Sequence, residues 1–182
     1  MNHEDIKIFA PEAGEPQAGE LDSLAAQTEA LRESGNLDAA KRLGRELAGL
    51  SAHSPELLSI SQSFGFTLTP AREQQLHVLM VFSGQHALRA ILPQLLSEAA
   101  ITAMNNYLIN HSKPFWDTIS DGSAFTQYIL AVPSKGQAEP VGGVFAHMCG
   151  QEDNPDLRKL GATVFTTAEQ LVRARWEEAH AE

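Results

Sequence analysis

Residues 69–91 read TPAREQQLHVLMVFSGQHALRAI, and this stretch decides the fold class. Thr69 followed by Pro70 is the pattern of a helix start, because a threonine side chain can accept from exposed backbone N–H groups and proline suits the first turn. Between positions 76 and 82 the segment is apolar on nearly every side of a helix. A helix without a polar face has to be covered by other elements. The stretch therefore predicts a central buried helix.

The segments around this stretch also have helical periodicity. Apolar residues recur three and four positions apart over residues 21–31, 37–50, 95–108, 125–132, 141–148 and 157–176. No segment alternates with a period of two for long enough to require a strand. The sequence therefore predicts an all-α fold, a single-domain helical bundle of about six to eight helices.

The N-terminal part divides into a tail and a pair of helices. Residues 1–19 are rich in Glu, Pro, Gly and Ala, which predicts a mobile acidic tail. Residues 20–50 hold two helical patterns separated by Gly35-Asn36, and so short a turn predicts an antiparallel αα-hairpin. We expect this hairpin to pack on a helical body over residues 54–180, so that residues 20–182 form one domain.

Composition excludes several classes of function. The formal net charge is -10, and no basic stripe interleaved with aromatic residues offsets it, which predicts no nucleic-acid partner. Cys149 is the only cysteine, so an intramolecular disulfide is excluded. The acidic N-terminus does not have the pattern of a signal peptide, and no apolar run approaches the ~20 residues that span a bilayer. The sequence thus predicts a cytoplasmic protein without membrane association.

Neither the histidines nor the glycines indicate a cofactor. None of the seven histidines stands in an HExxH motif or an i, i+4 pair, so no metal site is predicted. His77 interrupts the apolar run and is interpreted as a core histidine satisfied by one hydrogen bond. Gly142-Gly143 lacks the surroundings of a phosphate loop and is interpreted as a face for close helix packing, with a backbone anion nest as the alternative. The sequence predicts no cofactor and no catalytic residue.

Candidate ligand- or partner-binding residues gather between positions 107 and 128. They are Tyr107, Phe115, Trp116, Asp117, Asp121 and Tyr128. Phe115-Trp116 is expected in a connection between helices, where at least one ring has to find cover. The aromatic residues of this region either close an edge of the core, line an apolar pocket or form a partner-docking patch.

Asp117 and Asp121 are four residues apart, and two interpretations stay open for them. On one continuous helix they would share a face, where a carboxylate pair can divide acid from base work or hold a cation. Ile-Ser-Asp-Gly (119–122) instead favours a turn, after which Asp121 would cap the next helix.

Two resemblances concern the fold. Residues 21–50 resemble a single tetratricopeptide-like helical hairpin in ALRESGNLDAA (30–40), a unit that does not recur. The segments WDTISDGSAF (116–125), GGVFAHMCG (142–150) and LRKLG (157–161) resemble an uncharacterised family of small all-helical bacterial proteins. This second resemblance implies an all-helical bacterial cytoplasmic protein and implies no activity, cofactor or catalytic residue.

Two functions remain open from the sequence. The first is a non-enzymatic helical protein that mediates protein or peptide interaction, with a protein partner or as a homodimer, through Phe115-Trp116 and the patch at residues 6–9. The second is a small-molecule-binding protein or enzyme with an aromatic-lined pocket near residues 107–128. The walls of that pocket would be Tyr107, Trp116, Phe125 and Tyr128. Its polar groups would come from Asp117, Asp121, His111 or His77.

Overall fold

The computed structural model describes residues 18–53, 55–65, 68–132 and 138–179, and these residues form an all-α bundle without strands. The helices are α1 (Ala18–Glu33), α2 (Asn36–His53), α3 (Pro55–Ser63), α4 (Pro70–Ile91), α5 (Gln94–His111), α6 (Lys113–Ile119), α7 (Ser123–Ala131), α8 (Glu139–Met148) and α9 (Pro155–Glu178). The predicted fold class is confirmed. The described residues form nine helices, more than expected, because α6 occupies the place of a predicted connection.

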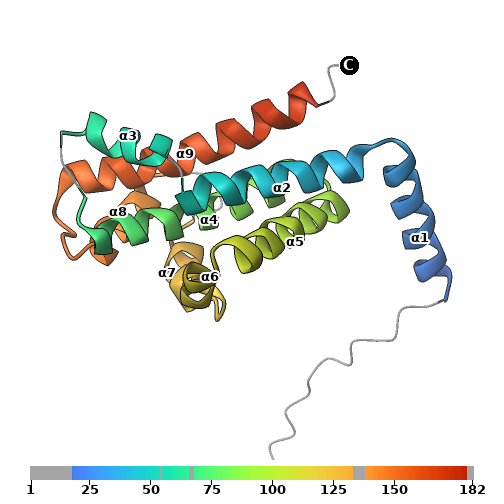
Figure 1. Cartoon of the computed structure of the whole chain (residues 1–182), viewed down its shortest axis with the longest axis horizontal. Helices are drawn as coiled ribbons and strands as arrows, with labels where there is room; N and C mark the ends of the chain where they lie inside the picture. The colour runs from blue at the N-terminus through green and yellow to red at the C-terminus, as the bar shows by residue number, and fades with distance from the viewer. Residues whose placement is uncertain (1–17, 54, 66–67, 133–137, 180–182) are drawn as a thin grey trace, which may run out of the picture.

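The central position predicted for α4 is also confirmed. Every residue from 78 to 84 is buried, and α4 packs against α2, α5, α7, α8 and α9. Its first turn begins as expected, since Thr69 Oγ1 accepts the Arg72 N–H at 3.4 Å and Pro70 is the first helical residue. α2, α5 and α9 are the long helices that lie around it in the elongated body in Figure 1.

Glycine allows two pairs of helices to approach very closely. A Cβ atom built on Gly44 of α2 would lie 2.0 Å from the Ala100 carbonyl oxygen of α5. A Cβ atom on Gly142 of α8 would lie 2.1 Å from the Arg158 carbonyl oxygen of α9, and Gly161 faces the same crossing. The helix-packing interpretation of Gly142 is therefore confirmed.

The N-terminal helices differ from the prediction in how they pack. α1 and α2 occur where expected, but Figure 1 shows α1 steeply inclined to α2 at one end of the body. Leu31 reaches the core, whereas Leu21 and Leu24 are 52% and 44% exposed. The prediction that α1 and α2 pack antiparallel as a hairpin is thus wrong. The physical reason is that the apolar face of α2 is already buried against α4, α5 and α9.

Two further expectations concern the tail and the membrane. α1 begins at Ala18, so the tail expected over residues 1–19 lies, up to residue 17, outside the described residues, as does the patch at residues 6–9. Among the helices that the structure describes, none has both the length and the apolar character needed to cross a bilayer.

Candidate functional site

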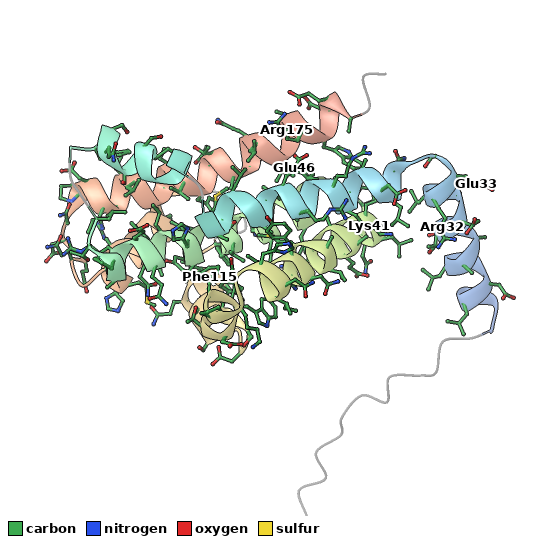
Figure 2. The ribbon with its side chains drawn as sticks, in the orientation of Figure 1. Arg32, Glu33, Lys41, Glu46, Phe115 and Arg175 are labelled. Carbon is green, nitrogen blue, oxygen red and sulfur yellow. The ribbon has the colours of Figure 1, made fainter. Side chains whose placement is uncertain are left out.

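Phe115, Trp116 and Asp117 lie on α6, which follows α5 almost directly (Figure 2). The prediction that these residues lie in a connection between helices is therefore wrong. The Phe115 ring is half-buried and meets His77 of α4 edge-on, with ring centroids 6.2 Å apart. Trp116 is half-buried and packs against the core, while Asp117 is exposed and its carboxylate pairs with Lys113 one turn earlier. Both rings thus find cover within the fold.

Asp121 lies one residue before Gly122, the N-cap position of α7, and its side chain accepts from the first backbone N–H of that helix. Its Oδ1 accepts the Ser123 backbone N–H at 2.9 Å and the Ser123 hydroxyl at 2.8 Å. The backbone hydrogen bond from Ser123, followed by the hydroxyl bond, holds the pKa of Asp121 below its ordinary value. Gly122, with φ of 73°, separates α6 from α7, so Asp117 and Asp121 do not share a helix face. No cluster of three or more metal-binding side chains occurs among the described residues.

Tyr128 is a core residue of α7. Its ring stacks on the ring of Phe82 of α4, with centroids 5.1 Å apart. The ring of Phe125 also contacts the Phe82 ring, with centroids 5.9 Å apart. Burial raises the pKa of the Tyr128 hydroxyl, which has no hydrogen-bond partner among the described residues. The next two residues, Ile129 and Leu130, are 63% and 81% exposed.

Tyr107 lies apart from these residues, on α5. Its ring stacks on His111 one turn later, with centroids 4.1 Å apart, and both residues line a groove between α2 and α5. The six candidate residues therefore occupy different places: the α2–α5 groove, α6, a helix cap and the core. The structure does not bring them together into the single aromatic pocket of the second hypothesis.

A smaller polar arrangement lies beside α6. A groove of about 510 Å³ runs between α4 and α6 and is lined by Glu73, His77 and Phe115, among others. The ring of His77 donates its Nδ1–H to the Ser51 carbonyl, which confirms the predicted single hydrogen bond and fixes the tautomer. His77 Nε2 then lies 3.8 Å from the Glu73 carboxylate, beyond hydrogen-bonding distance.

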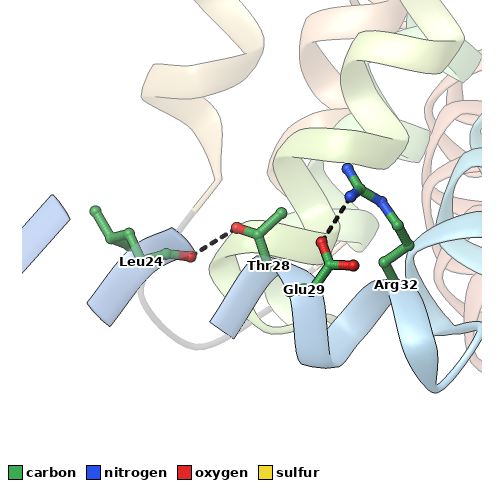
Figure 3. A network of polar contacts seen from close by, with 4 residues as sticks. All are labelled: Leu24, Thr28, Glu29 and Arg32. Atoms are coloured by element: carbon green, nitrogen blue, oxygen red, sulfur yellow. Dashed lines mark hydrogen bonds and ion pairs between the residues drawn. The ribbon is translucent and has the colours of Figure 1, made fainter. Parts of the chain in front are cut away.

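α1 carries an exposed pair of leucines on its apolar face. This helix has 16 residues, and its leucines at positions 21 and 24 stand outside the core. Figure 3 shows the polar contacts that support it from within: Thr28 Oγ1 donates to the Leu24 carbonyl at 2.8 Å, and Arg32 pairs with Glu29 at 2.6 Å. Both contacts join residues of α1 itself. Most of the stability of a helix in a protein comes from packing of its apolar face, so α1 would gain stability from a partner.

The groove between α2 and α5 is lined by basic side chains. It has a volume of about 390 Å³ and contains Lys41 and Arg45 on the α2 side, with Ala99, Ala103 and Tyr107 on the α5 side. None of the described residues that line it is acidic. Asp38, outside the groove, lies 3.9 Å from Lys41. Figure 2 shows Lys41 on α2, with Arg32 and Glu33 at the nearby end of α1.

Sequence reasoning identified the α1 stripe but expected it to be buried. One signal could have indicated otherwise: the stripe contains only three leucines, and α1 has four acidic residues, Glu20, Asp22, Glu29 and Glu33. The basic groove had no such signal, because its residues come from two helices about 60 positions apart whose contact depends on Gly44.

Comparison of this chain with protein-family models, with curated proteins and with solved structures finds no match. The resemblances to a family of helical bacterial proteins and to a tetratricopeptide hairpin therefore stay predictions.

Proposed function

We propose that this chain is a non-enzymatic protein that binds another protein through the apolar face of α1. The observation that carries the proposal is the exposure of Leu21 and Leu24, 52% and 44%, on a helix that projects from the body (Figure 1). Amphipathic helices commonly bind by laying such a face into a groove of their partner. A projecting helix has the geometry for this mode of binding, since its apolar side is not blocked by the body.

The charge of α1 limits the partner. Four acidic residues against Arg32 give residues 18–33 a net charge of -3. A complementary surface therefore combines an apolar floor with basic flanks. A nucleic acid does not offer such a surface, so the partner is not a nucleic acid. We place the interaction in the cytoplasm of a bacterial cell.

Photocrosslinking in the native cell tests this proposal. A benzophenone amino acid replaces Leu24 in one variant and Ala26 in the matched control, which lies about 200° around the helix from position 24. We expect a defined protein adduct from position 24 that is absent from position 26 and is lost when Leu21→Asp is added. Equal adducts from both positions, or none from position 24, would refute the proposal.

A second candidate function follows from the α4–α6 groove. There the Phe115 ring, the Nε2 acceptor of His77 and the Glu73 carboxylate line one concave surface, which suits a small amphipathic ligand that carries a hydrogen-bond donor. NMR titration with aromatic amines such as tryptamine, observed at the His77 ring resonances, tests it. His77 resonances that do not move at millimolar ligand would rule this function out.

A further inference from the structure

The turn between α1 and α2 holds α1 away from its own body. The Ser34 N–H donates to the Ala30 carbonyl at 3.0 Å, and the Gly35 N–H donates to the Arg32 carbonyl at 3.1 Å. The Gly35 carbonyl in turn accepts the Ala39 N–H at 3.0 Å, and Gly35 has a φ of 76°. The face of α2 along which α1 could lie back is covered by α4, α5 and α9. Leu21 and Leu24 find no cover on the described residues of their own chain, and a second molecule can supply it.

The α2–α5 groove is long enough to receive the exposed leucines of α1. The exposed leucines of α1, Leu21 and Leu24, span about 5 Å at the helical rise of 1.5 Å per residue, since Leu31 already reaches the core of its own chain. The α5 wall of the groove extends from Ala99 to His111, about 18 Å by the same rise. Small side chains, Ala99 and Ala103, on this wall leave space for leucine side chains to enter.

The groove also matches α1 in charge. Arg45, for which no ion pair occurs among the described residues, and Lys41, which lies 3.9 Å from Asp38, give the groove its positive charge, against the net charge of -3 over residues 18–33. A groove between α2 and α9 offers a rival apolar floor of about 340 Å³, formed by leucines. Its flanks are Glu46 and Arg175 (Figure 2), whose charges cancel, and Arg175 already pairs with Glu178 at 3.0 Å. Charge complementarity therefore selects the α2–α5 groove.

We infer that the partner of α1 is a second copy of this chain, and that α1 of each copy docks in the α2–α5 groove of the other. This inference rests on the proposed function of α1. The exchange makes two identical contacts related by a twofold axis, which is the usual closed form of a homodimer. Leu21 and Leu24 become buried, and Lys41 and Arg45 face the acidic side chains of α1.

Sedimentation equilibrium of the purified full chain tests the exchange. We expect a dimer at micromolar concentration. Arg45→Glu should weaken dimerisation at least about tenfold, because it places an acid opposite an acidic helix. Arg42→Glu is the matched control: it makes the same charge change one turn away on an exposed residue outside the groove, and the dimer should persist. Far-UV circular dichroism checks that both variants remain helical.

Mixing two monomeric variants separates the exchange from other dimers. One variant carries Leu21→Asp and Leu24→Asp and keeps its groove; the other carries Lys41→Glu and Arg45→Glu and keeps its α1. A 1:1 mixture can form one of the two contacts, so we expect heterodimers weaker than the wild-type dimer. No heterodimer, or a wild-type dimer that resists Arg45→Glu, would overturn the inference.

A wild-type monomer at all accessible concentrations would also overturn it. If the benzophenone at position 24 then still crosslinks to a different protein, the proposed function stands, and only the inference that the partner is a second copy is wrong. If position 24 crosslinks to no protein, the proposed function and the inferred homodimer are both wrong.

Discussion

Substitution of Gly142 by alanine should destabilise the protein, although alanine is the better helix former. The new Cβ atom would lie 2.1 Å from the Arg158 carbonyl oxygen, where ordinary contacts begin at 3.4 Å. α8 and α9 would have to separate by about 1.3 Å at this point. The obstacle is backbone, which cannot rotate away as a side chain can, and the movement would loosen the packing of Phe145 against Gly161.

The size of the effect follows from two opposing terms. Overpacking of a core costs about 1–3 kcal/mol, and a backbone clash lies at the upper end of this range. The gain in helix propensity from glycine to alanine returns about 0.5–1 kcal/mol. The net loss in the free energy of unfolding is about 2 kcal/mol, which for a chain of this size lowers Tm by about 4–8 °C.

The adjacent glycine supplies a matched control. A Cβ atom on Gly143 would lie 3.7 Å from Arg158 Nη2, an ordinary contact with a flexible side chain. Gly143→Ala should therefore keep only the propensity term and raise Tm by a few degrees. Thermal unfolding followed by circular dichroism at 222 nm measures both variants. If Gly142→Ala is as stable as Gly143→Ala, the close crossing of α8 and α9 is refuted.

Three further predictions test other parts of the structure. Gly44→Ala should lower Tm, because its Cβ atom would lie 2.0 Å from the Ala100 carbonyl oxygen. Gly49→Ala on the same helix is the control: its Cβ atom would lie 3.8 Å from the Tyr107 hydroxyl, and Tm should not fall. Thermal unfolding measures both variants. Burial raises the pKa of the Cys149 thiol to about 11, so alkylation by iodoacetamide at pH 8 should be about a hundredfold slower in the native protein than in guanidinium chloride, and equal rates would contradict the burial. Burial also lowers the pKa of His86 below 6.5. Since the unfolded chain then binds more protons, the free energy of unfolding should fall as pH decreases below about 6.5, and His86→Gln should reduce this fall in urea titrations; an unchanged pH profile would count against it.

Local sequence patterns determined most of the secondary structure. Thr69-Pro70 marked the start of α4, and the apolar run from position 76 marked it as the central helix, because capping and periodicity depend only on residues a few positions apart. The same locality explains why Asp121 could be assigned a capping role before the structure was known. The stretch at residues 113–119 was missed as a helix because a segment so short has little periodicity to detect.

The candidate site depended instead on contacts between distant segments. The sequence placed Tyr107, Phe115 and Tyr128 in one neighbourhood along the chain, but three helices carry them to a groove, the α4–α6 surface and the core. Proximity in sequence does not imply proximity in space once helices intervene between the residues.

The sequence by itself determined that the chain is helical, where most helices begin and end, and that α4 is buried. Only the tertiary structure decided that α1 projects from the body and that Lys41 and Arg45 flank a groove against α5. The physical reason is competition for one surface. The apolar face of α2 could have been covered by α1 or by α5, and Gly44 lets α5 approach within direct backbone contact, so α5 covers that face and the leucines of α1 remain exposed.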